Sequence, residues 1–185
     1  MNNLLSYPKR GSQILLFWCA AVLVYCLMVF GSLADIERIS GARAFDMRPT
    51  GYSYAYALAL ISALGEEGQR IYLAIQIPLD TAYPALLAIA SASSLFWLSQ
   101  SFGSTARWYR AVASVAYLAA IADYAENGLI VWMLYAGLGV PEALVTAASY
   151  ASMSKSVSST IVFTTLMIAL TEFAMRRMRQ RPKVS

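Results

Sequence analysis

Four apolar stretches constrain this chain more than any other feature, and they lie at residues 14–33, 79–98, 109–136 and 157–173. An α-helix of about 20 apolar residues crosses the roughly 30 Å of hydrocarbon in a bilayer. The composition agrees, because 59% of the residues are hydrophobic and 13% are charged, against roughly 25% charged in soluble domains. We therefore expect an all-α fold, a four-transmembrane-helix bundle that forms one integral membrane domain over residues 1–185.

The first stretch also admits a second interpretation. Lys9 and Arg10 precede it, and residues 32–34 resemble the small-residue cleavage site of a secretory signal peptide. Its apolar run is longer than the about 7 to 15 residues usual in such signals. This length favours a retained membrane anchor, while cleavage remains the alternative.

The basic residues predict the orientation, because cytoplasmic flanks of membrane spans carry an excess of Lys and Arg. One set of flanks holds Lys9, Arg10, Arg107, Arg110, Arg176, Arg177, Arg179, Arg181 and Lys183. The other set holds Arg38, Arg43, Arg48, Arg70 and Lys155, spread over many more residues. Both termini are therefore expected in the cytoplasm. The basic tail, residues 174–185, is expected to touch anionic membrane lipids, and no basic stripe with interleaved aromatics indicates nucleic acid.

Residues 34–78 form the one sizeable segment between predicted spans, and we place this segment outside the cytoplasm. Residues 53–64 read as a helix with apolar side chains at helical spacing. Gly65 and Gly68 are expected to interrupt it, with a new helix beginning at Arg70 and running into the second span. Pro78 and Pro84 should bend that helix. The result is an extracytoplasmic helical loop that folds back onto the bundle.

The chain contains no His, which removes the commonest metal ligand and the usual acid–base group at neutral pH. We therefore expect no metal and no cofactor. Asp and Glu are left as the candidate groups for acid–base chemistry.

Polar side chains interrupt the third span. Asp123, Glu126 and Asn127 follow one another at i, i+3 and i+4, so they share one helix face. Asp123 lies thirteen residues beyond Arg110, a rise of about 20 Å that places it in the outer half of the membrane. Each ionised carboxylate costs about 2.5–3.5 kcal/mol at the centre of a span, so this face should point inward.

Further polar groups are expected at the same depth. Asp80 begins the second span with Gln76 and Tyr83 on its helix face, and Lys155 lies at the outer end of the fourth helix. An isolated buried charge is expensive, so Lys155 should contact Asp123 or Glu126. At least one carboxylate is then left without a cation and is expected to keep its proton.

Two interpretations of this polar group remain open. The first is a network that only fixes helix packing. The second is a functional site, because intramembrane ionisable groups commonly mark function. Asp123, Glu126 and Asp80 are the candidate catalytic residues, and the sequence leaves open whether the protein is an enzyme. The candidate ligand-binding residues are Asp80, Tyr83, Asp123, Glu126, Asn127, Lys155, Arg70 and Gln76.

Several motifs resemble those of a family of small, uncharacterised four-helix bacterial membrane proteins. They are residues 45–53 (FDMRPTGYS), residues 64–68 (LGEEG) with Arg70 and Tyr72, Leu79-Asp80 with Tyr83-Pro84, and Asp123-Tyr124 with Glu126-Asn127. The resemblance implies a bacterial inner (plasma) membrane location and brings no known activity. A looser similarity, in size and helix count with acidic residues inside, is to the sterol-isomerase and sigma-2-receptor superfamily. It is fold-level only, and no catalytic residue follows from it.

From the residues we expect a site in the outer half of the bilayer that binds or modifies a lipid or another hydrophobic small molecule. A proton-coupled carrier subunit and a structural or assembly protein are the alternatives. The sequence does not decide the oligomeric state, and a homo-oligomer is compatible with it.

Overall fold

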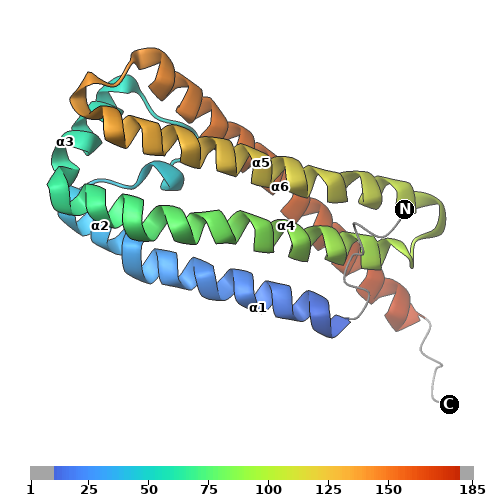
Figure 1. Cartoon of the computed structure of the whole chain (residues 1–185). Helices are drawn as coiled ribbons and strands as arrows, with labels where there is room; N and C mark the ends of the chain where they lie inside the picture. Colours follow the sequence, from blue (N-terminus) through green and yellow to red (C-terminus); the bar gives the residue numbers. More distant parts are fainter. Residues whose placement is uncertain (1–10, 180–185) are drawn as a thin grey trace, which may run out of the picture.

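The protein, described here by a computed structural model of residues 11–179, is a bundle of long helices with no strand in that range (Figure 1). The first helix runs through α1 (Gly11–Leu27), a π-helical turn η1 (Met28–Ser32) and α2 (Leu33–Ser40). The second runs through α3 (Tyr54–Ile71), the π-helical turn η3 (Tyr72–Gln76) and α4 (Ile77–Ser99). Helices α5 (Ala106–Ala136) and α6 (Glu142–Arg179) complete the bundle. Short 3-10 turns occur at η2 (Phe45–Met47), η4 (Gly103–Thr105) and η5 (Gly137–Gly139).

The all-α bundle predicted from the sequence is confirmed, and its helices are antiparallel neighbours. α5 packs along both α4 and α6, and α1 packs along α4. α1 begins and α6 ends at the same end of the bundle, while α3 and residues 41–53 close the opposite end (Figure 1). The N-terminal basic residues Lys9 and Arg10 and the tail beyond Arg179 lie outside the described residues.

Three helices are long and apolar enough to cross a membrane: Gly11–Ser40, Tyr54–Ser99 and Glu142–Arg179. Within the most apolar window of each, only 17%, 28% and 17% of the residues are buried. Most of their apolar side chains therefore point away from the protein, as is compatible with a membrane protein. α5 is also a long helix, of 31 residues. It is not one of the three apolar candidates, because its carboxylates and amide lower its mean hydropathy.

α3 starts where the sequence suggested, and the predicted break at Gly65 is present as a kink between two helical segments. Ser53 caps its first turn, with the Oγ accepting from the Tyr56 N–H at 3.2 Å, which confirms the predicted helix start. Gly65 alone leaves the helical conformation, at φ 58° and ψ −167°. The chain is helical again at once, so the expected break up to Arg70 is wrong. A single glycine absorbs the change of direction because it has no Cβ to clash.

The two π-helical turns lie side by side and join the first two helices. The Ser32 Oγ in η1 donates to the Gln76 Oε1 in η3 at 2.6 Å, and both side chains are buried. η3 ends two residues before Pro78, which occupies the first turn of α4. Since proline has no N–H, the widened turn before it accommodates the missing backbone bond.

Residues 41–53 return from α2 to α3 across the end of the bundle and are held at both ends. The Phe45 N–H donates to the buried Tyr72 hydroxyl at 3.0 Å. The Tyr52 N–H donates to the Ser149 Oγ of α6 at 2.9 Å. Gly51 has φ +79°, and a Cβ there would lie 2.4 Å from the same Ser149 oxygen. Gly51 therefore allows the close approach that fixes this loop against α6.

Replacing Gly51 with Ala should destabilise the fold more than the same change at Gly41. Both glycines have positive φ, but nothing lies within 4 Å of a Cβ at Gly41. The clash at Gly51 should add about 1–3 kcal/mol to the shared backbone cost. Unfolding by sodium dodecyl sulfate in mixed micelles measures both variants. Equal stability would contradict the close contact between Gly51 and α6.

Candidate functional site

A group of buried polar side chains lies where residues 41–53 meet η3, α4, α5 and α6. Asp80, Asp123 and Glu126 expose 2%, 6% and 0% of their surface. With Asp46 from the loop they form what we call the carboxylate cluster. The amides of Gln76 and Asn127 are buried beside it.

Lys155 is the cation of this cluster. Its Nζ lies 3.2 Å from the Asp123 Oδ1 and also pairs with the Glu126 Oε2. The two acids are one helical turn apart on α5, so a single ammonium from α6 reaches both. One turn before Lys155, the Ser152 hydroxyl donates to the Glu126 Oε1. The pairing of Lys155 with Asp123 or Glu126 expected from the sequence is confirmed.

Asn127 holds α5 to α4 at the level of Asp80. Pro84 has no N–H, so the carbonyl of Asp80, four residues earlier, lacks its usual helical donor. The Asn127 Nδ2 donates to that carbonyl at 2.9 Å. Next to it, the Tyr124 hydroxyl donates to the Thr81 carbonyl at 3.0 Å. The proline inside α4 thus creates a backbone acceptor that the polar face of α5 satisfies.

Asp46 is a member of the cluster that the sequence analysis did not predict. Its Oδ2 accepts from the Gln76 Nε2 at 3.0 Å, and Gln76 in turn accepts from Ser32. Nearby Arg48 does not neutralise it, because the Arg48 guanidinium stacks on the Tyr56 ring, 4.2 Å from its centroid. Burial, and then the neighbouring Asp80, raise the pKa of Asp46 to about 8. At neutral pH this carboxyl is therefore largely protonated.

A cavity of about 180 Å³ adjoins the cluster, far larger than the about 10–15 Å³ that one water needs. Asp46, Asp80, Asp123 and Lys155 form its polar side. Its apolar side comes from three helices: Tyr25, Met28 and Leu33 of the first, Tyr83 and Leu87 of α4, and Phe163 of α6. One cavity therefore presents charged groups and hydrocarbon surface together.

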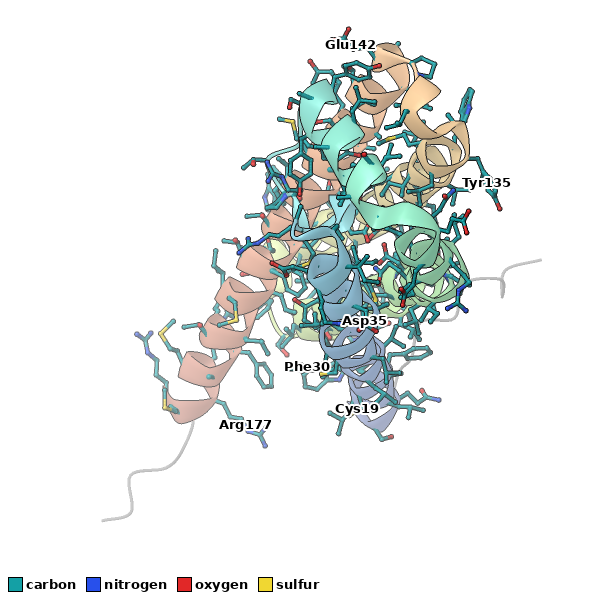
Figure 2. All side chains as sticks on the ribbon, turned by 90° about the vertical axis from the view of Figure 1, so that its left-hand side faces the viewer. Cys19, Phe30, Asp35, Tyr135, Glu142 and Arg177 are labelled. Atoms are coloured by element: carbon teal, nitrogen blue, oxygen red, sulfur yellow. The ribbon has the colours of Figure 1, made fainter. Side chains whose placement is uncertain are left out.

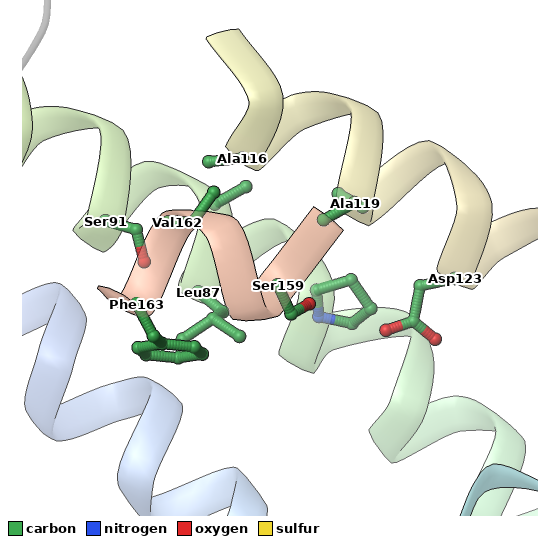
Figure 3. A pocket seen from close by; sticks show the side chains of 11 residues that line it. Leu87, Ser91, Ala116, Ala119, Asp123, Ser159, Val162 and Phe163 are labelled. Carbon is green, nitrogen blue, oxygen red and sulfur yellow. The ribbon is translucent and has the colours of Figure 1, made fainter. Parts of the chain in front are cut away.

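A narrow slot continues from this cavity between α4, α5 and α6 (Figure 3). The two share Leu87, Asp123, Ser159 and Phe163 in their linings. Small side chains line the rest of the slot, including Ala116, Ala119 and Ser91 (Figure 3). Its volume of about 20 Å³ has room for about one water, so it is a seam next to Asp123 rather than a second site.

The structure brings most of the predicted site residues together. Asp80, Asp123, Glu126, Asn127, Lys155 and Gln76 lie in or beside the cluster, and Tyr83 lines the cavity. Arg70 is exposed on α3, and within residues 11–179 no ion pair joins it to the cluster. Among the same residues, no group of three or more His, Cys, Asp or Glu has a geometry that could hold a metal ion.

Comparison with known proteins finds no protein family, no curated protein and no solved structure that matches this chain. The resemblance noted above therefore rests on its sequence motifs alone. The geometry of the cluster and the cavity carries the functional argument.

Replacing Lys155 with Met should destabilise the protein by about 3–5 kcal/mol, because Glu126 would stay buried without a cation. Replacing Glu126 with Gln in the same chain should recover part of that loss, since Asp123 is then the one former partner of Lys155 that stays buried without its cation. Unfolding in mixed micelles measures this cycle. Arg38→Met is the matched control, because its pair with Asp35 is exposed and is worth about 0–1 kcal/mol. A Lys155→Met protein as stable as the control would refute the role of this ion pair.

Proposed function

We propose that this chain is a four-span membrane protein that binds a lipid or another hydrophobic small molecule in the cavity beside the carboxylate cluster. One observation carries the proposal. The same cavity joins buried, charged groups to an apolar wall, which is the surface that an amphipathic molecule needs. The site would lie in the outer half of the bilayer, with both termini in the cytoplasm.

The packing of α5 supports four spans rather than three. α5 lies antiparallel between α4 and α6 along the bundle. Short connections, residues 100–105 and 137–141, join it to both. If α4 and α6 cross the membrane, α5 must cross with them. Its outer face is apolar, with Leu118, Ile121 and Trp132 about 60% exposed, and its carboxylates face inward.

The position of the cavity suggests entry from the membrane rather than from water. Its lining comes from the first helix on one side and from α6 on the other, and the two helices diverge from there towards Cys19 and Arg177 (Figure 2). Exposed apolar side chains flank it on both: Leu27 and Phe30 on the first helix, Val157 and Ile161 on α6. In a bilayer these side chains would contact acyl chains, so a lipid-soluble molecule could reach the cavity laterally.

The carboxylates also provide acid–base groups next to the bound molecule. Asp80 and Asp123 line the cavity, and a carboxylate within hydrogen-bond reach of a ligand can donate or accept a proton. Glu126 is enclosed behind them and pairs with Lys155. If the bound molecule is modified, Asp80 and Asp123 are the candidate proton-transfer groups and Glu126 is a positioning residue.

Protein purified in native membrane particles should carry a small molecule that mass spectrometry can identify. Asp123→Asn should deplete it about tenfold or more, since one lost charged hydrogen bond costs about 1.5–3 kcal/mol. Glu126→Gln should also deplete it, because Glu126 positions Lys155 at the cavity. Each change leaves Lys155 paired with the remaining acid, so the fold should persist, which circular dichroism checks. Asp35→Asn, on the exposed surface, is the matched control. Equal small-molecule content in the wild type and in all three variants would refute the proposal.

The proposed orientation predicts which exposed positions a membrane-impermeant maleimide reaches in intact cells. In a chain whose Cys19 and Cys26 are replaced with Ser, a cysteine at Glu67 should be labelled, because α3 would face outward. A cysteine at Arg107 should be labelled only after lysis. Both side chains are exposed, so accessibility on the protein itself is matched. Labelling of the cysteine at Arg107 but not of the one at Glu67 in intact cells would contradict the proposed orientation.

A further inference from the structure

The charges around the cavity do not balance. Four carboxylates, those of Asp46, Asp80, Asp123 and Glu126, surround one ammonium, that of Lys155. Lys155 is already paired with Glu126 and Asp123. Asp46 and Asp80 have no cation of their own among residues 11–179, yet both line the cavity. Acidic groups around the cavity therefore outnumber basic ones among the described residues.

Polar atoms of these two acids are also left without hydrogen-bond partners within the described part of the chain. The Asp80 Oδ2 is buried and unpartnered, in a residue that is 98% buried. The Asp46 Oδ1 is buried and unpartnered as well. A buried carboxylate oxygen without a donor costs about 1–3 kcal/mol or more. A ligand that brings donors to this side of the cavity would remove that cost.

Two aromatic rings also line the cavity. Tyr25 of α1 and Tyr83 of α4 lie together, with ring centroids 5.6 Å apart, and both line the cavity. The face of an aromatic ring carries partial negative charge and attracts cations. A cavity lined by surplus carboxyl groups and by tyrosine rings is complementary to a positive group that carries N–H donors.

From this juxtaposition of Asp46, Asp80 and the Tyr25–Tyr83 pair in one cavity, we infer that the ligand is an amphiphile whose polar end is a protonated amine. The ammonium lies against Asp80 and Asp46, where it favours the ionised form of these carboxyls and supplies the missing donors. The hydrocarbon part lies along Leu87 and Phe163 and passes out between the first helix and α6. The inference rests on the proposed binding function and names the class of molecule that is bound.

Three probes that share one tail test this inference: dodecylamine, 1-dodecanol and dodecanoic acid. Binding is measured at neutral pH to the full chain in phosphatidylcholine nanodiscs, with empty nanodiscs subtracted for partition into lipid. The amine should bind saturably and roughly ten- to a hundredfold more tightly than the alcohol, because it alone makes charge-assisted hydrogen bonds. The acid should bind more weakly than the alcohol. Equal or tighter binding of the alcohol or the acid would overturn the inference.

Variants then locate the amine. Asp80→Asn and Asp46→Asn should each weaken amine binding about tenfold and leave alcohol binding unchanged, whereas Asp35→Asn should alter neither. Asp46 lies in a loop rather than in a span, so Asp46→Asn tests the position of the amine if Asp80→Asn fails to fold. The comparison of the three probes uses the wild-type protein and depends on neither variant. Unchanged amine affinity in a folded cavity variant would overturn the assignment of the amine to these acids.

The outcomes also separate this inference from the proposed function. A co-purified molecule without a basic group, depleted in Asp123→Asn, would sustain the binding function and overturn the amine. Failure to bind any of the three probes, with no co-purified molecule, would overturn both.

Discussion

The pairing of Lys155 with Glu126 and Asp123 is the interaction on which the rest of this structure depends. Glu126 is fully enclosed, and a buried carboxylate is tolerated only when a cation and hydrogen bonds replace its water. Lys155 supplies the cation and Ser152 a hydrogen bond, both from α6. This pairing fixes the register of α5 against α6. It also occupies the ammonium of the cluster, so Asp80 and Asp46 face the cavity with no cation of their own among residues 11–179.

The polar face of α5 could be predicted because it follows from local spacing. Asp123, Glu126 and Asn127 share a helix face at i, i+3 and i+4, and the cost of exposing them to lipid turns that face inward. Asp46 could not be predicted, because its place depends on how residues 41–53 fold back, which Gly51, Ser149 and Tyr72 determine through contacts distant in sequence. Ser152 was not predicted either, because its hydrogen bond to Glu126 depends on how α6 packs against α5. Arg70 was expected nearby but projects from α3.

For the fold too, local sequence patterns predicted the helices, whereas features that depend on packing could not be predicted. The helix periodicity predicted the long helices and the start of α3 near Ser53. The glycine pattern predicted the kink at Gly65 correctly, but Gly68 stays helical and the helix resumes before Arg70. The role of Asn127 in satisfying the Asp80 carbonyl depends on Pro84, and only the packing of α4 on α5 reveals it. A polar network that served packing alone would need no cavity, whereas this one lines about 180 Å³ of open space.

The most direct test of this account is a solid-state NMR measurement on the protein in lipid bilayers, with labels at the Lys155 Nζ and the Glu126 Cδ. The account predicts a strong dipolar coupling between the two atoms, as expected for an ion pair in direct contact, and a weaker one from Lys155 to the Asp123 Cγ. Absence of coupling from Lys155 to either acid would contradict it, because the cluster would then lack the cation around which the cavity is built.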